Sequence, residues 1–112
     1  MRVGSPIEID IPKKEYILLQ WRILQARGIE KILLKSPPQV REKFDVWVTM
    51  VEQRGPQALR AIKGFHDEAL AGEWKGFRSS RLNAQYRVLY KIVEYQIEVY
   101  VLDVTPHDYR RR

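Results

Sequence analysis

The stretch QYRVLYKIV, residues 85–93, decides the fold, because its side chains alternate with the period of a β-strand. Successive side chains of a strand point to opposite faces of the sheet. One face carries Tyr86, Val88, Tyr90 and Ile92, and we expect helices to cover it. The other face carries Arg87 in the middle of an otherwise good strand. An arginine at that position predicts that the second face is left open for solvent or a ligand.

Two further strands are predicted beside this one. WKGFRSSRL (residues 74–82) precedes it and IEVYVLDV (residues 97–104) follows it. The intervening segments, 83–84 and 94–96, are short enough for hairpin loops, so the three strands should form an antiparallel meander. An apolar run at about 20–26 predicts one more strand near the start of the fold.

Two helices are predicted between the first strand and the meander. GIEKILLKSP (residues 28–37) reads as a short helix that Ser36, Pro37 and Pro38 terminate. The next helix has a continuous apolar stripe at helical spacing and ends at Gly55 and Pro56. The stripe consists of Val40, Phe44, Trp47, Val48 and Val51. The predicted fold class is α+β, with a two-helix hairpin packed on one face of a small twisted antiparallel sheet.

The chain of 112 residues has room for one domain, which we expect to span residues 1–112. Residues 1–19 are the least certain part of that domain. Ile7, Ile9 and Ile11 alternate with polar residues, which suits a short edge strand, and an N-terminal arm fits nearly as well. Both alternatives stay open at this point.

Composition narrows the class of protein. The chain has no cysteine, so disulfides and thiolate metal sites are excluded. No apolar run approaches a membrane span, and the first ten residues lack the apolar centre of a signal peptide, so we expect a soluble, cytoplasmic protein with no membrane partner. The net charge of +6 favours a polyanionic partner such as nucleic acid. A merely solvated basic surface is the alternative.

Arg87 is the focus of a predicted cationic face. A two-residue loop at 83–84 would place Ser80 opposite Arg87 and Arg78 further along the same face. A three-residue loop at 94–96 would place Asp103 opposite Arg87 on the other neighbouring strand. The arrangement could be a solvated ion pair, or a phosphate site in which Asp103 orients the guanidinium.

The run KGFHDEALAGEWKGFRSSRLNAQYRVLYKI (residues 63–92) and the closing VTPHDYR (residues 104–110) resemble the RelE/ParE superfamily of bacterial toxins. The resemblance is nearest to the RelE- and HigB-like toxins of toxin–antitoxin pairs, and it covers the chain from about residue 20. It implies an endoribonuclease that cuts mRNA on the ribosome, at the A site of the 16S rRNA. It also implies a cognate antitoxin as partner, and neither metal nor cofactor.

The same resemblance implies the catalytic residues. Arg87 matches the arginine that contacts the scissile phosphate, and Lys75 is the best match for a catalytic lysine. His107 stands where relatives carry the residue that protonates the leaving group or binds phosphate. Tyr109 matches a tyrosine that stacks on a base, and Asp108 matches an acidic residue beside it. His107 titrates near neutrality and suits acid–base chemistry.

Further basic residues are predicted to bind RNA, and two rival functions remain. The RNA-binding candidates are Arg78, Arg81, Arg110 and Lys63. Trp74 and Phe77 lie next to basic residues and could stack on RNA bases, although for Phe77 we favour a position that fills the interface between sheet and helices. The pair Asp67-Glu68 is too weak a signal for a metal site. A ParE-like, non-enzymatic inhibitor of DNA gyrase is the main rival function, and a non-catalytic RNA-binding relative is the second.

Overall fold

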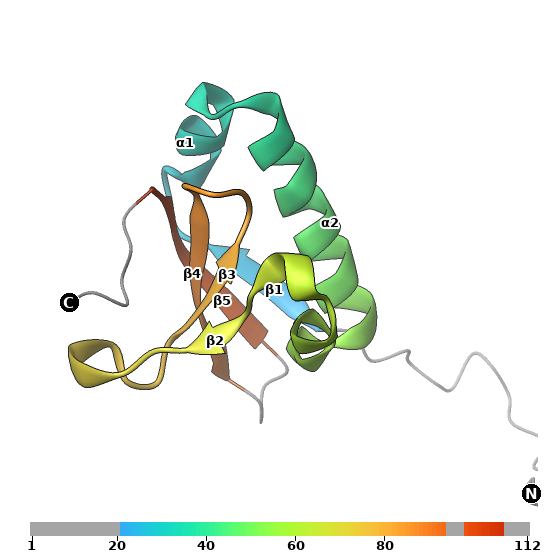
Figure 1. Ribbon diagram of the computed structural model, residues 1–112, viewed down its shortest axis with the longest axis vertical. Coiled ribbons are helices and arrows are strands. Elements are labelled where there is room, and N and C mark those ends of the chain that lie inside the picture. The colour runs from blue at the N-terminus through green and yellow to red at the C-terminus, as the bar shows by residue number, and fades with distance from the viewer. Residues whose placement is uncertain (1–20, 94–97, 107–112) are drawn as a thin grey trace, which may run out of the picture.

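The computed structural model describes residues 21–93 and 98–106, which form an α+β fold (Figure 1). Two α-helices, five strands and three short 3₁₀ helices follow one another in this part of the chain. In order they are β1 (Arg22–Gln25), α1 (Ile29–Lys35), α2 (Pro38–Arg54), η2 (Pro56–Ala61), η3 (Lys63–Phe65), β2 (Glu68–Ala69), η4 (Gly72–Trp74), β3 (Arg78–Arg81), β4 (Arg87–Val93) and β5 (Glu98–Thr105).

The strands form one sheet in the order β1-β5-β4-β3-β2. The pairs β2–β3, β3–β4 and β4–β5 are antiparallel, which confirms the predicted meander. β1 instead runs parallel to β5, with Arg22 opposite Glu98 and Gln25 opposite Val101. The predicted antiparallel sheet is therefore confirmed for β2 to β5, and the parallel β1 makes the whole sheet mixed. The pairing of β1 with β5 joins segments far apart in the chain, so local alternation cannot specify its direction.

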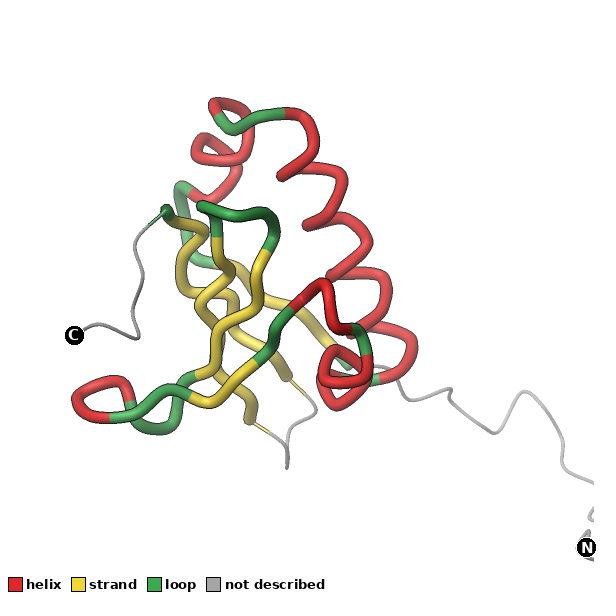
Figure 2. Tube along the Cα trace, in the orientation of Figure 1, coloured by secondary structure: helices red, strands yellow, loops and turns green. Residues whose placement is uncertain are grey.

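The two α-helices lie together against one side of the sheet (Figures 1 and 2). Most of the predicted stripe of α2 is buried there: Val40, Phe44, Trp47 and Val51. These side chains form one core with the apolar residues of the facing strand surfaces. The sheet contributes Leu82, Val88, Tyr90, Val101 and Val104 to it. The predicted helical hairpin and the predicted core face of β4 are confirmed.

Gly55 shows how the end of α2 is fixed against β1. Its φ of +88° lies in the region that favours glycine, and its amide donates to the Val51 carbonyl at 2.8 Å. A Cβ at this position would lie 2.6 Å from Nε1 of Trp21. The absent side chain therefore provides the space in which the Trp21 indole approaches the helix end.

The turn between β3 and β4 sets the register and corrects the prediction. The Asn83 side chain accepts hydrogen bonds from the amides of Gln85 and Tyr86 at 2.8 and 2.7 Å, which closes a turn longer than two residues. Arg81 consequently lies opposite Arg87, and Arg78 lies opposite Tyr90. The predicted placement of Ser80 opposite Arg87 is wrong. A slip of one residue moves every β3 side chain to the other face.

The segment between β2 and β3 extends away from the rest of the sheet (Figures 1 and 2). It contains η4 and a tight turn at Gly76, whose φ is +96°. Only residues 78–81 of the predicted strand 74–82 are therefore in a strand. The predicted alternation at Ile7, Ile9 and Ile11 lies outside the described residues. No helix in the described ranges is long and apolar enough to cross a membrane.

Candidate nucleic-acid interface

The side of the sheet opposite the helices is the candidate site, and we call it the helix-free face. Directly paired residues of neighbouring strands point to the same face, so the register defines its members. They include Leu24, Glu68, Ser79, Arg81, Arg87, Leu89, Lys91, Val93, Tyr100, Asp103 and Thr105, and the contact of Lys91 with the Phe77 ring adds Phe77. Cations outnumber acids in this set, as the prediction of a cationic face requires.

Two arginines lie side by side at the centre of this face. Arg87 is only 6% exposed, and its Nη1 donates to Ser79 Oγ at 3.2 Å. Arg81 is its direct partner across the strands, and the buried Nε of Arg81 has no hydrogen-bond partner in the part of the chain described. Like charges directly opposite each other destabilise a sheet, and an unpaired buried donor adds to that cost. A bound anion would relieve both.

β5 borders this arginine pair. Thr105, which is 4% exposed, lies opposite Arg87. Asp103 lies opposite Leu89 for two reasons: Val93 pairs with Glu98 and not with residue 97, and the register shifts by one more residue between Leu89 and Tyr90. The predicted direct pairing of Asp103 with Arg87 is therefore wrong, although both residues share the helix-free face.

An aromatic and cationic cluster lies further along the same face. Nζ of Lys91 is 5.5 Å from the centre of the Phe77 ring, and Trp74 meets that ring edge to face at 5.6 Å. The expectation that Phe77 fills the interface between sheet and helices is wrong, because Lys91 contacts it from the opposite face. Lys75, predicted on a basic strand, is exposed in the extended loop after η4. The strand alternation predicts Lys91 on the same face as Arg87, but the sequence did not mark it as a functional residue.

On the helix-covered side, a buried ion cluster surrounds Asp67. Its carboxylate accepts from Nε and Nη2 of Arg78 at 2.8 and 2.7 Å, from Ser80 Oγ at 2.6 Å, and from the Tyr90 hydroxyl. Ser80 Oγ in turn accepts from Trp47 Nε1 at 2.9 Å. The cluster joins α2, β3, β4 and the residue before β2. Arg78, predicted beside Arg87 as an RNA ligand, therefore lies on the opposite face.

The cluster perturbs the titration of its own members. Burial, followed by the negative charge of Asp67, raises the pKa of Tyr90 well above its ordinary value near 10. Burial alone would lower the pKa of Arg78, but its hydrogen bond to Asp67 and the charge of that carboxylate outweigh burial and raise it. The geometry is that of a closed ion pair whose carboxylate is fully used. Asp67 was also missed, because nothing local to the His-Asp-Glu run marks it as buried.

Lys63, another predicted RNA ligand, lies away from the arginine pair. It lines a hollow of about 570 Å³ together with Arg60, Ile62, His66, Asp67 and Glu68. His66 has a φ of +44°, and its Nε2 is 3.8 Å from Glu68 Oε1. His66 lies exposed at the C-terminal end of η3. The structure thus brings Arg87 and Arg81 together, whereas Lys63 lines a hollow that contains neither arginine.

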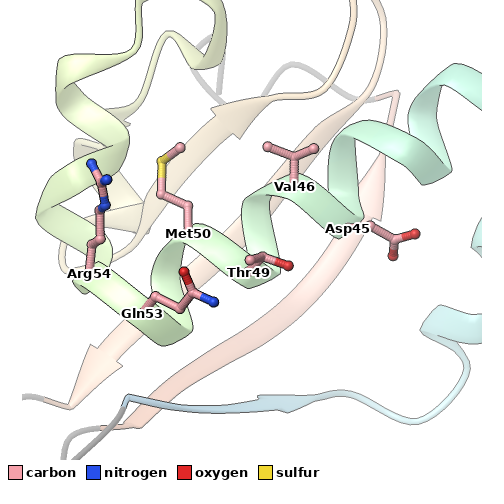
Figure 3. A pocket seen from close by; sticks show the side chains of 6 residues that line it. All are labelled: Asp45, Val46, Thr49, Met50, Gln53 and Arg54. Atoms are coloured by element: carbon pink, nitrogen blue, oxygen red, sulfur yellow. The ribbon is translucent and has the colours of Figure 1, made fainter.

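A second hollow, of about 440 Å³, lies along α2 (Figure 3). Its lining alternates apolar and polar side chains over about three helical turns. The lining residues are Asp45, Val46, Thr49, Met50, Gln53 and Arg54. Val46 is 51% exposed, so this side of α2 leaves apolar surface uncovered. The hollow contains no side chain of the helix-free face.

Four predicted site residues lie outside the described residues: His107, Asp108, Tyr109 and Arg110. The described chain ends at Pro106, one residue after the direct partner of Arg87. Within residues 21–93 and 98–106, no three His, Asp or Glu side chains are grouped so as to hold a metal ion.

Comparison of the structure with solved structures gives consistent matches. RelE in the RelE–RelB complex from Pyrococcus horikoshii OT3 has a TM-score of 0.62 at 21% identity, covering 84% of this chain and 99% of that one. A YoeB/ParE toxin from Agrobacterium tumefaciens has a TM-score of 0.61 at 14% identity, covering 78% and 99%. In the E. coli DinJ–YafQ toxin–antitoxin complex, the matched chain has a TM-score of 0.57 at 20% identity, covering 78% and 92%.

The sequence itself gives no such match. No protein-family model matches the chain, and no curated protein matches it. The structural matches nonetheless agree in architecture, and each spans nearly the whole of its own chain. The predicted resemblance to the RelE/ParE superfamily is thus confirmed at the level of the fold, and this chain has the RelE-like fold of these toxins.

Proposed function

We propose that this protein is the toxin of a toxin–antitoxin pair and acts as a metal-independent endoribonuclease that cuts mRNA on the ribosome. The observation that carries the proposal is the pair of arginines, Arg81 and Arg87, directly opposed on the helix-free face. Two guanidinium groups presented together suit a phosphodiester, because each can donate to two phosphate oxygens. The RelE-like fold supports the same reading.

In the proposed reaction, a ribose 2′-oxygen attacks the adjacent phosphorus and the bond from phosphorus to the 5′-oxygen breaks. The products are a 2′,3′-cyclic phosphate and a free 5′-hydroxyl. Arg87 and Arg81 would stabilise the extra negative charge on the phosphate in the transition state. The 2′-hydroxyl needs a general base to accept its proton, and the leaving 5′-oxygen needs a general acid to donate one.

The remaining roles come from the resemblance. His107 would protonate the leaving 5′-oxygen, and Tyr109 would position the nucleotide. Asp108 would orient the side chain of either His107 or Tyr109. These residues follow the end of β5, and β5 ends opposite Arg87. Lys75 would contribute charge from the extended loop. Arg78 has no part in the proposed reaction, because its guanidinium is bound to Asp67.

The proposed partners are the ribosome, its mRNA and an antitoxin protein. Structures similar to this one were solved as complexes with antitoxins, namely YoeB–YefM, RelE–RelB and DinJ–YafQ. By analogy, an antitoxin would cover the helix-free face and neutralise its arginines. Action on the ribosome would place the protein in the cytoplasm.

Induced expression in bacteria tests the proposal. We expect growth arrest and mRNA cuts within translated reading frames, and no cuts in the same transcript without its start codon. His107→Ala and Tyr109→Phe should abolish both effects, whereas Lys31→Ala, at an exposed position on α1, should abolish neither. Intact mRNA together with inhibition of DNA supercoiling by gyrase would contradict the nuclease function and favour the inhibitor of DNA gyrase. Ribosome binding without any cleavage would leave a non-catalytic RNA-binding protein.

A further inference from the structure

The aromatic cluster on the helix-free face is placed in line with the arginine pair. Ser79 lies opposite Leu89 and Arg81 opposite Arg87, and the same register continued by two residues sets Phe77 opposite Lys91. The contact of Lys91 Nζ with the Phe77 ring agrees with that register. Four residues of strand separate the two pairs, a distance of about 13 Å at 3.3 Å per residue. That distance is within reach of a neighbouring nucleotide.

The cluster also borders the segment between β2 and β3 that extends away from the sheet (Figures 1 and 2). Trp74, in η4, packs its ring against Phe77 at an angle of 83°, and both rings are only partly buried. Aromatic rings held at the edge of a cationic groove are the usual means by which proteins stack the unpaired bases of single-stranded RNA. Phe77 is not part of the buried core.

We infer that Phe77, supported by Trp74 and Lys91, is a nucleobase-binding subsite for a nucleotide next to the phosphate held by Arg81 and Arg87. The inference rests on the proposed function and adds to it a residue that binds a base. Lys91 occupies the ring in the free protein. The base displaces the Lys91 ammonium from Phe77, and the freed ammonium pairs with a backbone phosphate.

The relative strengths of the two contacts favour this exchange. A cation above an exposed phenylalanine changes an equilibrium by about two- to fivefold. Stacking of a base on an aromatic ring is worth about 5- to 150-fold. The exchange also keeps the charge of Lys91 in use, because the flexible lysine side chain can turn from the ring to a phosphate.

Equilibrium binding of a short single-stranded oligoribonucleotide with 2′-O-methyl groups, which prevent cleavage, tests the inference. Phe77→Leu should weaken binding about 5- to 150-fold, whereas Phe77→Tyr, which keeps a ring, should not. Leu34→Ala, at a position 75% exposed on α1, is the control for an unrelated surface. Lys91→Met should lower the salt dependence of binding by about one phosphate contact.

A set of oligonucleotides with one abasic position each locates the base. At one position, loss of the base should weaken binding by the wild type as much as Phe77→Leu does. The Phe77→Leu variant should bind the same abasic oligonucleotide no more weakly than it binds the complete one. If Phe77→Leu binds every oligonucleotide as the wild type does while Arg87→Met does not bind, the subsite is overturned and the proposed function stands. If Arg87→Met also binds normally, the proposed function fails.

Discussion

The two faces of strands β3 and β4 use the same residue types for opposite purposes. On the helix-covered face, Arg78 meets a carboxylate that is fully buried, and every oxygen of Asp67 accepts a hydrogen bond. On the helix-free face, Arg81 and Arg87 face each other, and Thr105 rather than an acid lies across from Arg87. Arg78 is part of a closed ion cluster, whereas Arg81 and Arg87 lie directly opposite each other on neighbouring strands. The position of an arginine in the strand alternation, and not its residue type, therefore distinguishes the structural arginine from the two proposed to bind RNA.

Removal of the Asp67 carboxylate should have the largest effect on stability, because it disrupts the ion cluster on the helix-covered face. Asp67→Ala leaves the Arg78 charge without its partner, and it leaves Ser80 and Tyr90 without an acceptor. Breaking a buried ion pair from one side costs about 3–5 kcal/mol. Urea unfolding should show a loss of that size, whereas Asp45→Ala, on the exposed side of α2, should change stability by about 0.5 kcal/mol or less. Equal stability of the two variants would contradict the role of the cluster.

Replacing Arg87 or Arg78 by methionine should affect different properties, because the two arginines lie on opposite faces of the sheet. Arg87→Met keeps the apolar stem and removes the charge, so we expect cleavage to fall about 10²- to 10³-fold with little loss of stability. Arg78→Met should instead lower the free energy of unfolding by about 3 kcal/mol or more, because it strands the Asp67 carboxylate. Cleavage assays and urea unfolding on both variants measure this. The distinction fails if both variants lose the same property.

Most features that depend on residues close together in the sequence are predicted correctly, whereas features that depend on distant residues are not. The α2 stripe and the inward face of β4 depend on residues within a few positions, and Val40, Trp47, Val88 and Tyr90 are buried as their spacing predicts. The register of β3 depends on the Asn83 turn, where one additional loop residue reverses which arginine faces outward. The Asx-type bonding of Asn83 is a local signal that could have indicated the longer turn.

Long-range contacts lie beyond such reasoning. Asp67 reaches Tyr90 across 23 positions, and only the assembled sheet brings them together. The parallel pairing of β1 with β5 is longer still. For the candidate site, the sequence predicts a cationic face around Arg87 and names Arg81 only as an RNA-binding candidate, without placing it beside Arg87. It assigns Arg78 to the same face, because arginines of the two faces look identical before the register is known.

Alkaline pH should weaken the completed cluster through Tyr90. The pKa of Tyr90 is raised in the folded protein, whereas in the unfolded chain it is near 10. Above pH 10 the unfolded chain therefore binds fewer protons than the folded one, and stability falls as pH rises, by at most about 1.4 kcal/mol per pH unit. Tyr90→Phe should cost about 1–2 kcal/mol at neutral pH and should lack this part of the alkaline loss. Parallel pH profiles of wild type and variant would refute the assignment.

The smallest expected difference is between two adjacent serines, and it is the strictest test of the comparison. Ser80 bonds Asp67 and accepts from Trp47, so Ser80→Ala leaves two buried groups short of a partner and should cost about 1–3 kcal/mol. Ser79 accepts one bond from Arg87 at 3.2 Å, so Ser79→Ala should cost about 0.5–1 kcal/mol. Its effect should appear instead in RNA cleavage, because the freed Arg87 guanidinium is less firmly positioned. Both serines are fully buried, so burial cannot produce the difference. If Ser80→Ala lowered cleavage and Ser79→Ala lowered only stability, the helix-free face would not be the active one.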